Sequence, residues 1–263
     1  MKILVPVKQV QILDEDFEIR DDGRAVDPSY LEHELNEWDD YSWEAALQLM
    51  ELHEAIEAIP LTVGPEESEE GLRKCLAKGG ERAIRVWDEN LEGSDQMVVA
   101  RVIAAVAQKE GADLILAGTQ SNDFGHGQTG IATAAMLGWS HVAVVSEIQY
   151  EPDSKKLTVK RELEGGVEEE LELTLPAVLT IQLGINEPRY ASLRGIKQAR
   201  EKPVATMTCA ELGLTEDQIG EAGSSSRIRR IYVPERGKAE IISGTPAEQA
   251  KRLLEIINEL KGA

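Results

Sequence analysis

Cysteine is nearly absent from this chain of 263 residues. Cys75 and Cys209 lie far apart, and neither belongs to a C-x-x-C pair. This excludes a disulfide framework and a cysteine-based zinc site. The histidines show no metal-ligand spacing either, so we expect surface or packing roles for His33, His53, His126 and His141.

Aromatic residues make up only 4% of the chain, whereas hydrophobic residues make up 42%. We therefore expect a core of Val, Ile, Leu and Ala. No apolar run approaches the length of a membrane span, and the N-terminus has no signal-peptide layout. The sequence predicts no membrane insertion and, for a bacterial host, a cytoplasmic location.

Motifs of bond-making catalysis are also missing. The sequence contains neither the nucleophile elbow G-x-S-x-G nor the zinc motif H-E-x-x-H. The phosphate loop G-x-x-x-x-G-K-[ST] is absent as well, which argues against phosphoryl transfer. We expect no catalytic residue and no metal site.

Positive charge is scarce, since 28 Lys and Arg stand against 48 Asp and Glu and give a net charge of −20. This balance argues against nucleic-acid binding, which needs a basic footprint. Residues 182–202 are an exception, with five cations and two carboxylates around Tyr190 and Leu193. Large apolar side chains framed by cations on a loop are typical of a partner-docking surface. A solvated basic loop is the alternative, and we expect the stretch at an edge of the sheet.

Short apolar runs alternate with helical patterns along the first part of the chain. Strands are expected at 3–7, 59–63, 82–87, 114–117 and 142–145, with helices between them. Asp39 or Asp40 is expected to cap the first helix, and Ser94 a later one. The alternation predicts an α/β fold with a doubly wound, mostly parallel sheet. Residues 147–150, 157–162 and 167–173 add an antiparallel edge, and 21–23 mark the turn of a hairpin excursion.

The alternation weakens after residue 203. We therefore divide the chain into a nucleotide-binding α/β domain, 1–203, and a C-terminal arm, 204–263. Thr245 and Pro246 predict the start of a final helix. Its apolar stripe is Ala250, Leu253, Leu254, Ile257 and Leu260. The stripe predicts packing either on the chain's own domain or on a partner.

Residues 118–130, GTQSNDFGHGQTG, follow a predicted strand and open a predicted helix. The G-x-G-x-x-G spacing of Gly125, Gly127 and Gly130 is a poor dinucleotide fingerprint, because it follows the fourth strand and has no acidic partner downstream. Small residues before a helix nevertheless leave N–H donors free for an anion. The stretch predicts nucleotide binding, with a plain βα loop as the alternative.

Several motifs together resemble the β subunit of electron transfer flavoproteins. They are VPVKQ, LNEWDDYSWEAA, LRKCLAKG, GTQSNDFGHGQTG, VKRELEGG and NEPRYASLRGIKQA. The resemblance runs nearly from end to end of the chain, to the C-terminal helix. The likeness is greatest to the methylotroph type that accepts electrons from trimethylamine dehydrogenase. It implies an electron carrier without catalysis of its own, in a heterodimer whose α subunit holds most of a shared FAD.

The resemblance also implies roles for individual residues. A structural AMP would be held by Pro6, Val7, Asn36, Asp39, Val63, Asp123, Gly127, Gln128, Thr129 and Gly130. The FAD would lie near Leu13, Arg161 and Glu162. A flavin-containing dehydrogenase would dock on Leu193, with Tyr190, Arg189 and Arg194 around it. The C-terminal helix would pack on the α subunit.

Three alternatives stay open. A stand-alone nucleotide-binding protein of the universal-stress-protein type would explain the βα units and the glycine loop. A bifurcating flavoprotein subunit would hold a second FAD in place of AMP. A purely structural partner would hold no nucleotide.

Overall fold

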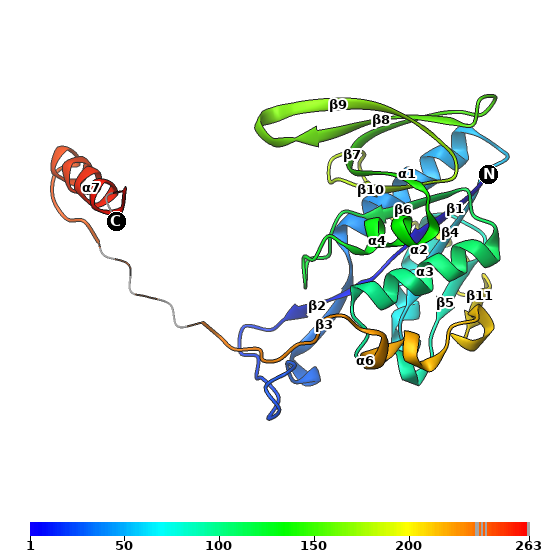
Figure 1. Cartoon of the computed structure of the whole chain (residues 1–263), viewed down its shortest axis with the longest axis horizontal. Helices are drawn as coiled ribbons and strands as arrows, with labels where there is room; N and C mark the ends of the chain where they lie inside the picture. The colour runs from blue at the N-terminus through cyan, green and yellow to red at the C-terminus, as the bar shows by residue number, and fades with distance from the viewer. Residues whose placement is uncertain (235–236, 238, 240, 262–263) are drawn as a thin grey trace.

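A nine-stranded sheet forms the centre of the molecule (Figure 1). The computed structural model describes residues 1–234, 237, 239 and 241–261. The strand order is β11-β5-β4-β1-β6-β10-β7-β8-β9, and pairing is parallel from β11 to β7 and antiparallel from β7 to β9. The expected α/β fold with an antiparallel edge is therefore confirmed.

The strands of this sheet are β1 (Lys2–Pro6), β4 (Glu57–Val63), β5 (Ala83–Val86), β6 (Leu114–Gly118), β7 (Ser140–Glu151), β8 (Lys156–Leu163), β9 (Val167–Thr174), β10 (Ala177–Ile181) and β11 (Val204–Met207). The helices are α1 (Glu37–Leu52), α2 (Glu69–Lys78), α3 (Gln96–Glu110), α4 (Thr129–Leu137), α5 (Leu193–Ala199), α6 (Gly220–Gly223) and α7 (Pro246–Lys261). A separate antiparallel ribbon consists of β2 (Gln9–Leu13) and β3 (Leu31–Leu35).

Helices cover both faces of the sheet. Trp43 of α1 and Leu72 of α2 are buried in one apolar cluster with alternate residues of β1. Val102 of α3 and Ala134 of α4 are buried in a second cluster on the other face. Because successive side chains of a strand point to opposite faces, the inner parallel strands β1, β4, β6 and β10 are buried on both sides.

Two expected helix caps are wrong by a few residues. The N-cap of α1 is Asn36, and Asp39 lies within the first turn. Asp39 is the third residue of α1, and its Oδ2 accepts from the backbone N–H of Lys8 at 2.8 Å instead of from the helix start. The cap of α3 is Asp95 instead of Ser94, and its carboxylate accepts from the N–H groups of Met97 and Val98.

The sheet differs from the expectation at three strands. β7 is one long strand through 142–145 and 147–150, with an irregular register and a positive φ at Val144. β10 lies between β6 and β7, so the stretch 182–202 leaves the interior of the sheet and not its edge. The sequence does not predict β11, which pairs with β5 and forms one edge of the sheet, while β9 forms the other. The sheet therefore continues beyond residue 203, while the two-part division of the chain stays a prediction.

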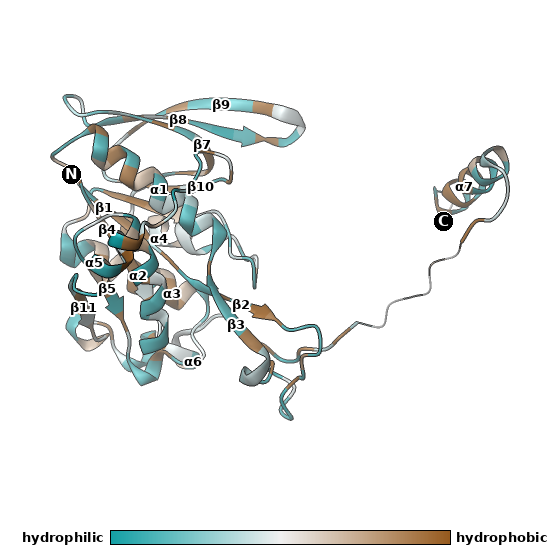
Figure 2. Cartoon of the chain, turned by 180° about the vertical axis from the view of Figure 1, so that it is seen from behind, coloured by the Kyte–Doolittle hydropathy of each residue, from teal (hydrophilic) through white to brown (hydrophobic). Residues whose placement is uncertain are grey.

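The β2–β3 ribbon, the β8–β9 hairpin and the final helix α7 extend from the rest of the molecule. The expected turn at Asp21 to Gly23 is present, closed by an Ile19 to Val26 bridge. In Figure 1 the β8–β9 hairpin lies at the top of the molecule and the β2–β3 ribbon in its lower half, with α7 standing apart from both. Figure 2 shows both hydrophobic and hydrophilic residues along α7. The expected final helix is confirmed.

Candidate functional site

The carboxyl ends of β1, β4 and β6 meet at one edge of the sheet, where open α/β folds bind ligands. Val7 follows β1 and is buried there. Its N–H donates to the carbonyl of Leu61 at 2.8 Å, and its carbonyl accepts from Thr62 Oγ1 at 2.9 Å. These bonds fix the end of β1 against β4, which ends at Val63. Pro6 and Val7, the residues expected to contact a nucleotide, lie at this end of β1.

Asn36 joins the start of α1 to the loop that follows β6. Its Nδ2 donates to the carbonyl of Gln120 at 2.9 Å, and its Oδ1 accepts from the N–H of Asn122 at 3.2 Å. Asn36 is itself buried. One amide side chain therefore sets the path of residues 119–123, because both halves of the amide are engaged with that backbone.

Lys8 connects the same loop to the end of β1. Its Nζ lies 2.7 Å from a carboxylate oxygen of Asp123, whose side chain is 9% exposed, and 4.9 Å from the ring centroid of Phe124. Its backbone N–H donates to Asp39. Lys8 thus brings together two of the expected residues, although no sequence pattern singled it out. The V-K-Q segment after a buried strand was its only signal.

The pKa values of the two carboxyls at this edge, Asp39 and Asp123, are shifted in opposite directions. Burial raises the pKa of Asp39 to about 7, and the hydrogen bond from the Lys8 backbone only partly opposes this. Burial also acts on Asp123, but the hydrogen bonds from Lys8 and Ser121 outweigh it and hold the pKa of Asp123 below its ordinary value. Asp123 is therefore a fixed negative charge, whereas Asp39 exchanges its proton near neutral pH.

Glycines allow the loop and α4 to lie close to the sheet. A Cβ on Gly118 would lie 2.4 Å from Asp39 Oδ1, and one on Gly130 would lie 2.7 Å from Thr180 Cγ2. Gly127 has a φ of +62°, a region that few other residues adopt. These positions place the first turn of α4 directly against β6 and β10.

The N-terminus of α4 is not capped by its own preceding side chain. Gln128, the N-cap residue, makes no capping hydrogen bond, and its Oε1 accepts from Gln96 Nε2 at 2.9 Å. His126 contacts Gln96 from the other side, at 3.0 Å. Thr129 and Gly130 follow in the first turn of α4. The arrangement leaves backbone donors at a helix N-terminus, which favour anions.

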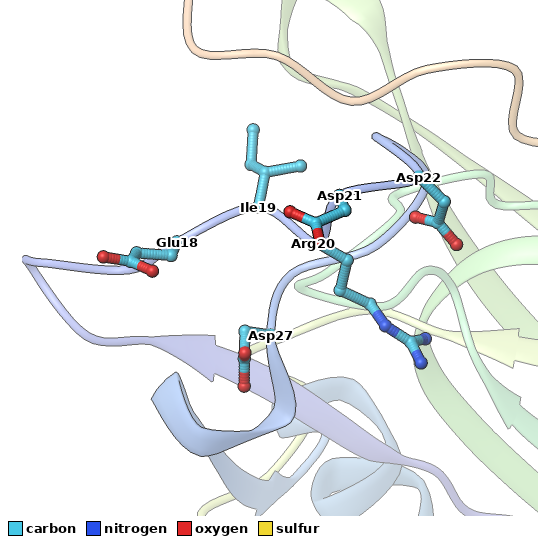
Figure 3. Close-up of a pocket in the computed structure, with 6 residues that line it drawn as sticks. All are labelled: Glu18, Ile19, Arg20, Asp21, Asp22 and Asp27. Atoms are coloured by element: carbon cyan, nitrogen blue, oxygen red, sulfur yellow. The ribbon is translucent and has the colours of Figure 1, made fainter.

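Two cavities lie in this half of the molecule, and they differ in chemical character. One of ≈250 Å³ adjoins the ion pair described above and is lined by Lys8, Gln9, Gln11, His33, Pro65, Glu67, Ser68, Asp123 and Phe124. The other, of ≈410 Å³, is a hollow on the excursion before β3 (Figure 3). Its lining is Ile19, Arg20 and four carboxylates, which do not converge on a common point. The smaller cavity is the better candidate, because it contains both charges and an aromatic ring beside the sheet edge.

The residues expected near a flavin are not brought together within this chain. Leu13 ends β2 and is 48% exposed. Arg161 and Glu162 lie in β8, and Arg161 forms a 2.6 Å ion pair with Glu169 of β9. Since the β2–β3 ribbon and the β8–β9 hairpin lie apart from each other in Figure 1, the relation of these residues to a flavin stays a prediction.

The basic stretch presents two large side chains to solvent. Tyr190 is 98% exposed and Leu193 is 89% exposed. Arg194 is also exposed, beside Leu193 in the first turn of α5. Arg189 differs from the other three, because its guanidinium is engaged by Glu44 and Glu51 of α1. Tyr190, Leu193 and Arg194 are therefore the exposed members of the expected set, whereas the partly exposed Arg189 is tied to α1.

Across the described ranges, no three His, Cys, Asp or Glu side chains are grouped so that they could hold a metal ion. No helix in the same ranges is long and apolar enough to cross a membrane. Burial raises the pKa of the thiols of Cys75 and Cys209, the latter to about 11.

Comparisons with known proteins agree with one another. The electron transfer flavoprotein domain matches residues 25–212. The chain is 53% identical to the electron transfer flavoprotein subunit beta of Methylophilus methylotrophus, over 100% of both chains. It is 35% identical to the mitochondrial subunit beta of Arabidopsis thaliana, over 96% of this chain and 97% of the relative. It is 36% identical to the electron transfer flavoprotein subunit beta of Homo sapiens, over 81% of this chain and 84% of the relative. The chain therefore belongs to the electron transfer flavoprotein family, as a beta subunit.

Proposed function

We propose that this chain pairs with an electron transfer flavoprotein α subunit, which holds most of a shared FAD, and that the pair carries electrons from a flavin-containing dehydrogenase. The observation that supports this most is the full-length match to a beta subunit at 53% identity. The chain would provide a scaffold, one wall of the flavin site and a docking surface. The FAD would supply the redox chemistry.

We propose a structural AMP at the carboxyl edge of the sheet. The support is the set of constraints on the loop after β6. Asn36 and Lys8 fix its first half, while Gly127 and Gly130 bring its second half against the sheet. The α4 N-terminus would favour the phosphate, and Gln128 and Thr129 are the polar side chains beside it.

The dehydrogenase would dock on the surface formed by Tyr190, Leu193 and Arg194. A single well-exposed apolar anchor commonly contributes ~2 kcal/mol or more to an interface. The acidic remainder of the chain leaves this basic stretch as a distinct electrostatic feature. Its charges would act chiefly on the association rate and on salt dependence. A trimethylamine dehydrogenase-like enzyme is the partner we propose, because the sequence motifs resemble the methylotroph type.

The C-terminal arm, residues 204–263, would pack on the α subunit through its final helix. Leu253, Leu254 and Leu260 of α7 are 51%, 59% and 74% exposed. An amphipathic helix with so exposed a stripe suits packing on another chain. Leu13, Arg161 and Glu162 would lie on the side of this chain that meets the α subunit and its FAD.

The small molecules of the purified pair test this proposal. The chain would be co-expressed with an electron transfer flavoprotein α subunit, purified and denatured, and the released nucleotides identified. We expect a yellow heterodimer with about one FAD and about one AMP, in line with a shared flavin and one nucleotide site. A second FAD instead of AMP would favour the bifurcating alternative. A colourless chain that forms no pair would contradict the proposal.

A further inference from the structure

Arg189 is bound to α1 through all three nitrogens of its guanidinium. Its Nε donates to Glu44 Oε2 and its Nη2 to Glu44 Oε1, both at 2.8 Å. Nη1 and Nη2 also reach the carboxylate of Glu51. The backbone N–H of Arg189 donates to Glu44 as well, at 3.2 Å. A bidentate pair of this kind fixes direction as well as distance.

Glu44 is the buried partner in this contact. Its side chain is 5% exposed, whereas that of Glu51 is 56% exposed. Gln48 Nε2 donates a further hydrogen bond to Glu44 at 3.2 Å. Because a carboxylate at this depth needs a counter-charge, the removal of Arg189 leaves Glu44 buried and unpaired. The removal of Glu44 leaves Arg189 with the exposed Glu51 as its remaining carboxylate partner. Burial acts to raise the pKa of Glu44, but the Arg189 contacts hold it below its ordinary value.

The same face of α1 holds the residues just before Arg189. Asn186 Nδ2 donates to the carbonyl of Tyr41 at 3.1 Å. Tyr41, Glu44, Gln48 and Glu51 follow one another at helical spacing, so a single stripe of α1 contacts the loop. This stripe fixes the N-terminal side of the exposed segment.

The C-terminal side of the segment is held by α2. Arg73 Nη1 donates to the carbonyls of Ala199 and Lys202, at 2.7 and 2.6 Å. A Cβ on Gly195 would lie 2.2 Å from the carbonyl oxygen of Ala77, so α5 lies directly on α2. Ser192 caps α5 by accepting from the Gly195 N–H at 3.0 Å. Tyr190 and Leu193 are therefore exposed between two fixed points.

We propose that Glu44, acting through Arg189, is a positioning residue that holds the Tyr190–Leu193 segment in its docking conformation before any dehydrogenase binds. The inference rests on the docking function proposed above. Ordering a loop during association costs free energy, and a loop ordered in advance avoids that cost. The partly exposed Arg189 is thus a support of the docking surface that is tied to the buried Glu44, instead of a contact with the dehydrogenase.

Two variants and a matched control test this role in the purified heterodimer. Glu44→Gln and Arg189→Gln each remove one side of the pair, and the double variant closes a mutant cycle. Glu54→Gln removes a carboxylate from the exposed turn after α1 and is the control. The readouts are FAD content, tryptic cleavage after Arg194 in the free heterodimer, and the KM and kcat of a dehydrogenase that reduces it.

We expect either single variant to speed cleavage after Arg194 by about tenfold, because the segment opens more often. KM should rise by about tenfold at unchanged kcat and FAD content, since only the binding step is affected. The double variant should equal the singles, as partners in one contact are not additive. Glu54→Gln should match the unaltered protein. If Glu44→Gln fails to assemble, Arg189→Gln decides the question, because it leaves α1 unaltered.

The outcomes separate the positioning role from the docking function. Unchanged cleavage and KM in both variants would overturn the positioning role, and so would additive effects in the double variant. Leu193→Ala should raise KM without changing cleavage after Arg194. An unchanged KM for Leu193→Ala would overturn the docking function itself, and with it any purpose for the positioning.

Discussion

Lys8 and Asp123 form an ion pair of 2.7 Å that ties the end of β1 to the loop after β6. Asp123 supplies a mostly buried carboxylate, and the Lys8 side chain is 45% exposed. The pair closes one side of the ≈250 Å³ cavity. Asn36 also binds the loop after β6, so the position of the loop depends on both contacts and not on the ion pair alone.

Replacement of this cation should loosen nucleotide retention. In Lys8→Met, Asp123 loses its partner, so we expect about fivefold weaker retention of AMP, which corresponds to ~1 kcal/mol. Nucleotide content after extensive dialysis measures the change. Lys156→Met removes a similar 2.7 Å pair, with Glu172, from the β8–β9 hairpin and is the matched control. Equal AMP retention in both variants would show that Lys8 has no role at the site.

The buried carboxyl of Asp39 should make stability depend on pH. Its pKa is raised on folding from 3.8 to about 7, so the folded protein binds this proton more tightly than the unfolded chain. The resulting stabilisation is complete below pH 3.8 and is lost as pH rises toward 7, by up to ~1.4 kcal/mol per pH unit.

Asp39→Asn removes that dependence, so its stability relative to the unaltered protein should increase as pH rises and level off above about pH 8. Urea unfolding of both proteins at several pH values between about 4 and about 8 measures this difference. A constant difference across that range would mean that Asp39 stays ionised in the folded protein.

Gly130→Ala should destabilise the junction of α4 with the sheet. The new methyl group would lie 2.7 Å from Thr180 Cγ2 and 3.3 Å from Ala117 Cβ. Overpacking of this kind costs ~1–3 kcal/mol. Thr180→Ser in the same protein removes the clashing methyl group and keeps the hydroxyl that accepts from the Val144 N–H, so it should restore stability. Thermal unfolding compares Gly130→Ala, the double variant and the unaltered protein, and failure of Thr180→Ser to restore stability would contradict the clash.

A charge on the apolar stripe of α7 should weaken the heterodimer. Leu254→Asp replaces a leucine side chain, 59% exposed in the isolated chain, with a carboxylate. If the α subunit covers this position, burial of the unpaired charge should weaken association by about tenfold or more. Sedimentation of the mixed subunits measures it, with Glu255→Gln as the control on the same helix. Unchanged association would place α7 outside the subunit interface.

The sequence predicts the parallel strands well, because each is a short apolar run that is buried on both faces. β11 is different. Only Val204 and Met207 of its four residues are partly buried, so the strand carries no continuous apolar signal. The sequence pattern changes after Ser146 and so divides β7 in two, whereas the structure joins both parts in one strand. The strand continues through register shifts against β10 and β8, which depend on distant pairing and have no local signature.

The site shows the same division between local and distant information. Asn36, Asp39 and Asp123 were expected from resemblance, and the structure joins them to one another through Lys8 and the loop backbone. Lys8 itself was missed, because a lone lysine after a strand is uninformative without its distant partner. Arg189 was expected on the docking surface, but its contact with Glu44 depends on how the loop crosses α1.

Electron acceptance by the Leu193→Ala heterodimer tests the central claim most directly. The measurement is the KM and kcat for reduction by the dehydrogenase, together with FAD content. Loss of an anchor worth ~2 kcal/mol should raise KM by about 30-fold while FAD content stays the same. An unchanged KM, or a loss of FAD in parallel with activity, would contradict a docking role for the surface around Leu193.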